Sequence, residues 1–101
     1  MPSKNKARGN ALERKIVKLA EAHGVDARRA WGSDGRSMGY TEDVDGIFDV
    51  NGEIWKWQAK KRMKIAEYIF PNDNVHIQIV EANRGKPHVV ILLDDFLSLL
   101  K

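Results

Sequence analysis

The chain has 101 residues, of which 43% are hydrophobic and 31% charged, and its formal net charge is +3 at pH 7. This length and composition suit a globular protein with one core, so we expect residues 1–101 to form a single domain and exclude a disordered chain. The lack of cysteine excludes disulfides and thiolate sites, and no apolar run approaches the ~20 residues that span a membrane.

The first predicted element is an amphipathic helix from about Arg8 to His23, which follows a basic, flexible tail over residues 1–6. Its apolar positions recur at the helical spacing i, i+4, i+7 and i+8; they are Leu12, Ile16, Leu19 and Ala20. Gly24 is placed to end the helix as a C-cap. Glu13 has two interpretations of equal weight: the third position of a capping box that begins at Asn10, or a carboxylate that reaches the sheet edge and a metal.

A short strand and a loop follow this helix. Residues 25–31 predict the strand. Residues 32–39 contain three glycines and two serines, a composition that favours a flexible loop and supplies small hydrogen-bond donors.

The strongest local signal is a β-hairpin formed by residues 44–50 and 54–61 around Asn51-Gly52. Alternation in its second strand puts three residues on each face: Trp55, Trp57 and Ala59 on one, and Lys56, Gln58 and Lys60 on the other. We expect the tryptophans to pack against the first helix, because large aromatics dominate small cores; base stacking is the alternative. The polar face is then free to line a cleft.

The segment after the hairpin is ambiguous. Its apolar residues at 75, 77 and 79 alternate as in a strand, whereas Asn72-Asp73-Asn74 resembles a helix N-cap and Gly85-Lys86-Pro87 a helix stop. We favour a helix over residues 74–84.

The chain then ends with a buried strand over residues 88–93 and a short helix over 96–100, capped by Asp94-Asp95. The order α-β-β-β-α-β-α predicts an α/β sandwich around a mixed central sheet flanked by helices.

The acidic run at the start of the hairpin carries the candidate chemistry. Hydrolysis of a phosphodiester needs an activated water and a neutralised phosphate; Mg²⁺ held by carboxylates supplies both, and a nearby lysine orients the nucleophile. Asp45 is the first candidate for the central metal ligand, and Asp43, on the same predicted strand face, is the second. Lys60 on the partner strand is the candidate lysine. The alternative is an exposed acidic start of a strand.

Positive charge is concentrated on both sides of this acidic run. Residues 1–18 hold six Lys or Arg against one acid, and residues 53–64 hold five against one. Such clusters fit a polyanion held beside a metal site, with a merely solvated surface as the alternative. The side chains expected to contact phosphates are Lys4, Lys6, Arg8, Arg36, Lys61, Arg62 and Lys64.

Four short motifs in this order resemble the PD-(D/E)XK nuclease superfamily, and within it the archaeal-type and phage Holliday junction resolvases. They are Glu13, Gly32-Ser33, Val44-Asp45 and Gln58-Ala59-Lys60. The resemblance covers most of the chain and implies a restriction-endonuclease-like fold. It implies that Asp45 and Glu13 bind Mg²⁺, or Mn²⁺ in its place, and that the Ala59 carbonyl completes the shell. Lys60 would assist the nucleophile and Ser33 would lie near the scissile phosphate.

Gln58 departs from the family pattern, which has Glu or Asp at this position. A glutamine still offers a carbonyl oxygen to a hard cation, but it removes one negative charge, so we expect weaker metal binding. Some related nucleases carry a Gln-x-Lys form and remain active, so we keep Gln58 in the predicted metal shell and catalytic site.

Together these features predict a Mg²⁺-dependent DNA endonuclease that is selective for branched structure and resolves four-way junctions in DNA recombination. The resemblance further implies a symmetric homodimer, and we expect it in the cytoplasm, or in the host cytoplasm if a phage encodes it. The alternatives are a restriction- or repair-type endonuclease on linear or damaged DNA, a catalytically silent DNA-binding subunit and, more weakly, a basic module that binds RNA or a protein.

Overall fold

The computed structural model describes the backbone of residues 4–100 and the side chains of residues 9–100. Its helices and strands are, in order, α1 (Lys4–Ala22), β1 (Asp26–Arg29), β2 (Gly46–Val50), β3 (Glu53–Trp57), β4 (Ile77–Val80), β5 (His88–Ile91) and α2 (Leu93–Leu99). Short 3₁₀ turns occupy residues 31–33, 35–38 and 67–69. Neither helix of the described part of the chain is both long and apolar enough to cross a membrane.

Helix α1 begins earlier than predicted. Residues 4–6, which were expected in a flexible tail, are helical, and Met1–Ser3 lie outside the described residues. The helix ends as predicted at Gly24, which is left-handed with φ +75°, and the Val25 N–H donates to the Ala20 carbonyl at 2.9 Å. Because Asn10 lies inside the helix and not at its start, the capping-box interpretation of Glu13 is wrong.

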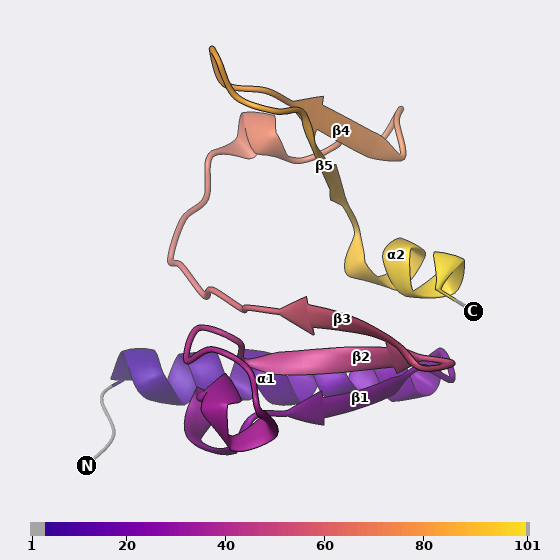
Figure 1. Ribbon diagram of the computed structural model, residues 1–101. Coiled ribbons are helices and arrows are strands. Elements are labelled where there is room, and N and C mark those ends of the chain that lie inside the picture. The colour runs from indigo at the N-terminus through magenta and orange to yellow at the C-terminus, as the bar shows by residue number, and fades with distance from the viewer. Residues whose placement is uncertain (1–3, 101) are drawn as a thin grey trace.

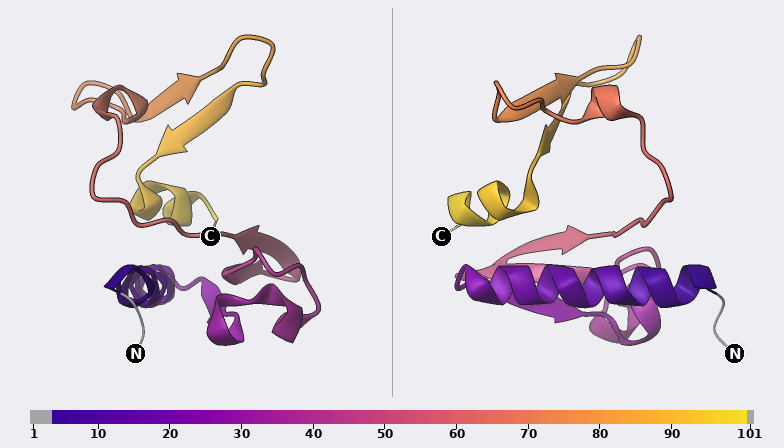
Figure 2. Two further views of the ribbon diagram at one scale, coloured as in Figure 1. Left: turned by 90° about the vertical axis from the view of Figure 1, so that its left-hand side faces the viewer. Right: turned by 180° about the vertical axis from the view of Figure 1, so that it is seen from behind.

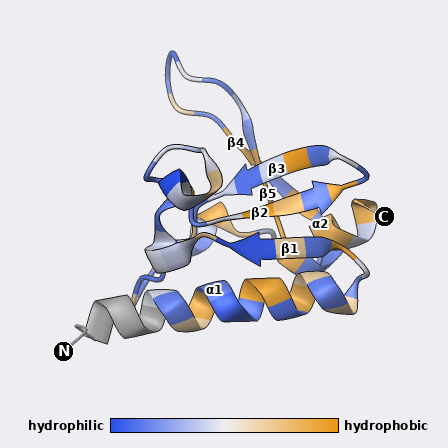
Figure 3. Ribbon diagram, turned by 60° about the horizontal axis from the view of Figure 1, so that its bottom comes forward, coloured by the Kyte–Doolittle hydropathy of each residue, from blue (hydrophilic) through white to orange (hydrophobic). Residues whose placement is uncertain are grey.

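The predicted hairpin is present and belongs to a three-stranded antiparallel sheet of order β1-β2-β3. Its turn residues Asn51 and Gly52 have φ of 54° and 90°, as two-residue hairpin turns require. Helix α1 lies alongside β1, with hydrophobic and hydrophilic residues alternating along it (Figure 3). The sheet and α1 together form the half of the molecule that holds the candidate site.

The core forms where α1, the sheet and α2 meet, and its buried residues are Ala20, Val25, Phe48 and Leu97. Trp57 packs on this core with its ring centroid 5.7 Å from that of Phe48. Trp55 instead meets Phe96 of α2 edge-on at 5.7 Å. The prediction that the tryptophans belong to the core is therefore confirmed for Trp57, whereas Trp55, 42% exposed, packs on α2 and not on the first helix as predicted.

The helix predicted over residues 74–84 is wrong, because β4 pairs with β5 as an antiparallel hairpin. The alternating residues decide the outcome: Ile77 pairs with Ile91, and Ile79 with Val89. The apparent N-cap is a local turn in which the Asn72 side chain accepts from the Asn74 N–H at 2.8 Å.

A single mixed central sheet is not observed, because the described strands form two separate antiparallel sheets. Figures 1 and 2 show the chain leaving β3, arcing away from the first sheet and reaching the β4–β5 hairpin, with α2 between the two sheets. The prediction of an α/β protein is confirmed. The short terminal helix is also present, but it begins at Leu93, so Asp94-Asp95 lies in its first turn.

Candidate nuclease site

Glu13 is a buried carboxylate on the part of α1 that lies next to β1, with only 4% of its surface exposed. Arg29 at the end of β1 donates to its Oε1 from Nη2 at 3.2 Å and from Nε at 3.3 Å. The Ser33 hydroxyl lies 2.9 Å from both carboxylate oxygens. A buried carboxylate is stable only when it is paired and hydrogen-bonded, and these partners hold Glu13 in one position.

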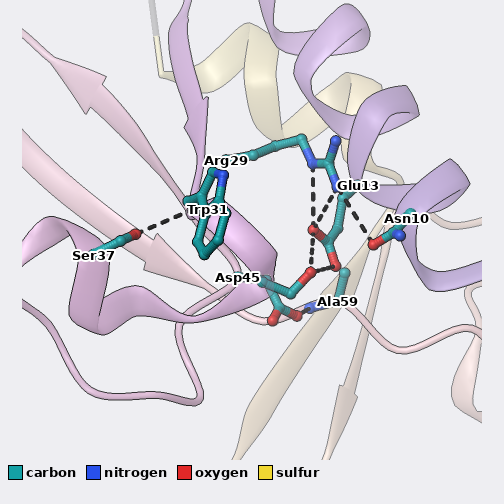
Figure 4. Close-up of polar contacts among 8 residues, drawn as sticks. Asn10, Glu13, Arg29, Trp31, Ser37, Asp45 and Ala59 are labelled. Carbon is teal, nitrogen blue, oxygen red and sulfur yellow. Dashed lines mark hydrogen bonds and ion pairs between the residues drawn. The ribbon is translucent and has the colours of Figure 1, made fainter. Parts of the chain in front are cut away.

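Asp45 lies just before β2 and is 8% exposed. Its backbone extends the sheet on both sides: the Ala30 N–H donates to its carbonyl at 2.8 Å, and its own N–H donates to the Trp57 carbonyl at 2.9 Å. Its Oδ2 accepts from the Ala59 N–H at 2.8 Å. Figure 4 shows the Glu13 carboxylate between the Arg29 guanidinium and the Asp45–Ala59 pair. The fold thus brings together two acids that are far apart in the sequence.

The close packing of β2 on β3 fixes the backbone next to Asp45. Gly46 pairs with Trp57, and a Cβ at Gly46 would lie 2.2 Å from the indole ring. Only glycine fits at this distance. The indole of Trp57 and the absence of a side chain at Gly46 therefore allow the start of β2, next to Asp45, to pack closely on the end of β3.

The second hairpin strand ends earlier than predicted. It stops at Trp57, so Gln58 and Lys60 follow the strand in an irregular segment and are exposed, while Ala59 is half-buried. The chain bends there because the Ala59 N–H bonds to the Asp45 carboxylate instead of continuing the ladder. The segment Gln58-Ala59-Lys60 adjoins Asp45 through Ala59, as expected. The expected alternation of Gln58 and Lys60 on one strand face is not observed, because both residues lie beyond the strand.

Asp43 is not on a strand face shared with Asp45, because it lies in the turn before β2 and is exposed. It accepts a hydrogen bond from the Thr41 hydroxyl. That bond, followed by a backbone hydrogen bond and the nearby Lys56 charge, holds the pKa of Asp43 below its usual value. Asp43 therefore has local partners and no contact with Glu13 or Asp45 among those described.

The glycine-rich loop that precedes Asp45 is held by specific bonds. Gly32 and Ser33 both have positive φ, 62° and 56°, which directs the Ser33 hydroxyl to Glu13. A Cβ at Gly35 would lie 2.3 Å from the Thr41 carbonyl oxygen, so the loop packs tightly on the chain that leads to Asp45. The flexible loop that the composition suggested is thus an ordered part of the site.

The predicted phosphate contacts lie in three places. Lys61, Arg62 and Lys64 are exposed on the segment after β3. Arg36 is also exposed, but it bonds to Asp34 at 2.6 Å, which raises the pKa of Arg36 and lowers the pKa of Asp34. The side chains of Lys4, Lys6 and Arg8 lie outside those the structure describes.

The donor set can be compared with the needs of a magnesium ion. Within the described residues no three His, Cys, Asp or Glu side chains form a cluster, so a metal would depend on Glu13 and Asp45 together with neutral oxygens. Oxygen is the donor that Mg²⁺ prefers. Asp45 Oδ1 has no hydrogen bond within the described range, whereas the Glu13 oxygens are engaged by Arg29 and Ser33. The set fits a weakly held hard cation better than a tight structural metal.

Sequence reasoning missed Arg29 and Asn10. The Arg29 Nη2 lies 3.5 Å from Asn10 Oδ1 as well as 3.2 Å from Glu13. No local pattern distinguishes Arg29 from Arg28, its neighbour in β1. The signal that could have found it is indirect: a glutamate on the inner face of a helix needs a cationic partner, and the end of the next strand is the nearest place for one.

The described residues thus place two buried carboxylates beside a basic segment in an α/β fold, an arrangement compatible with a hydrolase that acts on a polyanion. The chain belongs to the archaeal Holliday junction resolvase family (Hjc), a family of PD-(D/E)XK nucleases, whose model matches residues 4–95. Neither curated proteins nor solved structures gave a match. The predicted family and the predicted Holliday junction resolvase function in DNA recombination are confirmed. The cytoplasmic location stays a prediction.

Proposed function

We propose that the chain resolves four-way DNA junctions by Mg²⁺-dependent hydrolysis, with Glu13 and Asp45 as the acidic pair. The observation that carries this proposal is the convergence of these two buried carboxylates, from α1 and from the start of β2, at the place where Gln58-Ala59-Lys60 leaves β3. Burial of two acids in so small a core is costly, which favours a functional reason for keeping both.

Each residue then has a stated role. Asp45 would hold the metal, since its Oδ2 is fixed by Ala59; Glu13 would bind the metal directly or through water. The Ala59 carbonyl and the Gln58 amide oxygen would complete the shell. When bound, Mg²⁺ or Mn²⁺ supplies charge for the phosphate and a more acidic water. Lys60, exposed beside this group, would orient the nucleophile, and Ser33 would position Glu13.

Exposed basic side chains around the site would hold the DNA backbone. Lys61, Arg62 and Lys64 continue the chain directly from the site, and Arg36 stands on the adjoining loop. Because contacts to phosphates carry no sequence information, this surface supports recognition of shape instead of sequence.

We also propose that the resolvase is a homodimer, on the evidence of surface area. The chain exposes 8137 Å², whereas a compact monomer of this mass exposes about 5800 Å². Its radius of gyration is 14.8 Å, against about 13 Å for a compact domain of this length. The excess matches the area that one partner of a large obligate interface buries. The exposed apolar residues that such an interface would cover lie on one face of the β4–β5 hairpin. They are Ile77, Ile79 and Val89, all at least 43% exposed.

Cleavage of matched substrates tests the nuclease. The protein would be incubated with a four-way junction and with linear duplex of equal length, with and without Mg²⁺. We expect paired nicks in the junction only, lost in Asp45→Asn and Lys60→Ala and kept in the control Asp43→Asn. Equal cutting of linear DNA would favour a restriction or repair enzyme. Junction binding without cleavage in either Mg²⁺ or Mn²⁺ would show a silent DNA-binding subunit.

The dimer needs its own measurement. Light scattering or sedimentation should give twice the mass of the 11.5 kDa chain. Ile79→Asp places a charge on the exposed apolar face and should give monomers, whereas Glu81→Gln, next to that strand, should not. A wild-type monomer at micromolar concentration would refute the proposed dimer.

A further inference from the structure

Trp31 is the most exposed of the three tryptophans, at 85% of its surface, while Trp55 is 42% exposed and Trp57 is half-buried. A single exposed apolar side chain needs no explanation by itself. The position of Trp31 does need an explanation, because this residue lies between Ala30, which bonds to Asp45, and Ser33, which bonds to Glu13.

The backbone of Trp31 is held on both sides. Its N–H donates to the Ser37 hydroxyl at 3.2 Å, and its carbonyl accepts from the Asp34 N–H at 3.2 Å. The ring nevertheless takes part in no aromatic or cation–π pair within the described residues. The loop therefore presents the indole to solvent at a fixed point beside the site (Figure 4).

The chemistry around the indole fits a nucleobase. Arg28 and Arg36, on the same strand and loop, each pair with a nearby aspartate but keep 66% and 68% of their side chains exposed, so both can still face a polyanion. An exposed aromatic ring among basic groups binds single-stranded or unstacked nucleic acid by stacking, whatever the base, because every base has a π face.

Continuous duplex hides the faces of its bases, whereas base pairs at a branch can open. We propose that Trp31 stacks on a nucleobase next to the scissile phosphate and so selects branched DNA over continuous duplex. This inference rests on the proposed nuclease function, to which it adds the residue that reads the branch.

The test uses a four-way junction with 2-aminopurine at the branch, and the same label within a linear duplex, both without divalent metal. Wild-type protein should quench the label in the junction. Trp31→Ala should lose that quenching and bind the junction about 10-fold more weakly, with duplex affinity within about twofold of wild type. Trp31→Phe should keep most of both effects. Tyr68→Ala, which removes another aromatic ring that is 78% exposed, is the matched control and should behave as wild type.

Three results would overturn the inference: unchanged junction binding and quenching in Trp31→Ala, an equal loss on junction and duplex, or a change in oligomeric state, which would make Trp31 a subunit contact. The quenching is measured without cleavage, so it stands apart from the nuclease. If wild type cuts no junction, the proposed function fails; if it cuts and Trp31→Ala cuts equally well, only the role of Trp31 fails.

Discussion

Replacing Arg29 by alanine removes the guanidinium that neutralises the buried Glu13 carboxylate. Breaking a buried ion pair by removing one partner costs about 3–5 kcal/mol, because the other charge stays buried. Since 31% of the Arg29 side chain is exposed and Ser33 still donates to Glu13, we expect the lower end, about 3 kcal/mol. For a domain of this size that loss lowers the melting temperature by roughly 12–24 °C.

Thermal and urea unfolding in the absence of divalent metal would measure this loss. Arg28→Ala is the matched control, because Arg28 is the neighbouring arginine, is 66% exposed and lies 3.6 Å from the exposed Asp26; its removal should cost less than about 1 kcal/mol. Adding Glu13→Gln to Arg29→Ala should recover part of the stability, since no unpaired charge then remains.

The same variant separates an ion pair from a metal site. A cation that binds Glu13 replaces the missing guanidinium, so Mg²⁺ should stabilise Arg29→Ala more than it stabilises wild type. An Arg29→Ala variant as stable as Arg28→Ala, or losses that simply add in the double variant, would refute the coupling between Arg29 and Glu13.

Three further predictions concern single groups. Gln58→Glu restores a negative ligand and should lower the Mg²⁺ concentration needed for cleavage; an unchanged requirement would remove Gln58 from the metal shell. Gly46→Ala places a Cβ against the indole of Trp57 and should destabilise the fold by about 3 kcal/mol in urea unfolding, whereas Gly9→Ala, with open space around it, should not. The pKa of Asp34 is lowered chiefly by its hydrogen bond from Arg36. The contribution of this pair to stability is therefore present above the unfolded pKa near 3.8 and is lost as pH falls through the pKa of folded Asp34. An NMR titration should show the pKa of folded Asp34 rising in Arg36→Gln.

Local chemistry made part of the fold predictable. The turn at Asn51-Gly52 and the end of α1 at Gly24 each depend on positive φ, which glycine and asparagine adopt readily and which the sequence therefore predicts. The helix expected over residues 74–84 failed because its capping signals are equally satisfied by turns, and only pairing with β5 shows that Ile77 and Ile79 alternate across a sheet. Such pairing is set by tertiary contacts that a local pattern does not contain.

The candidate site was only partly predictable, again because some of its contacts are tertiary. Asp45 stood out by its position at the start of a hairpin, and the structure buries it. Arg29 did not stand out, because its importance comes from a contact with Glu13 across 16 residues of sequence. The bend after Trp57 was also hidden, because it depends on a bond between the Ala59 N–H and a side chain 14 residues earlier.

The residues of the candidate site lie between Asn10 and Lys60, and the proposed phosphate contacts that follow them end at Lys64, whereas the chain after Lys64, with its β4–β5 hairpin, contributes none of them. In the proposed dimer, the first part of the chain would carry out the hydrolysis and the second would set the separation of the two active centres. A change in the exposed face of the β4–β5 hairpin would then shift the distance between the two cuts. Glu13, Asp45 and Ala59 would keep their mutual geometry throughout, so substrate shape and reaction chemistry could evolve independently.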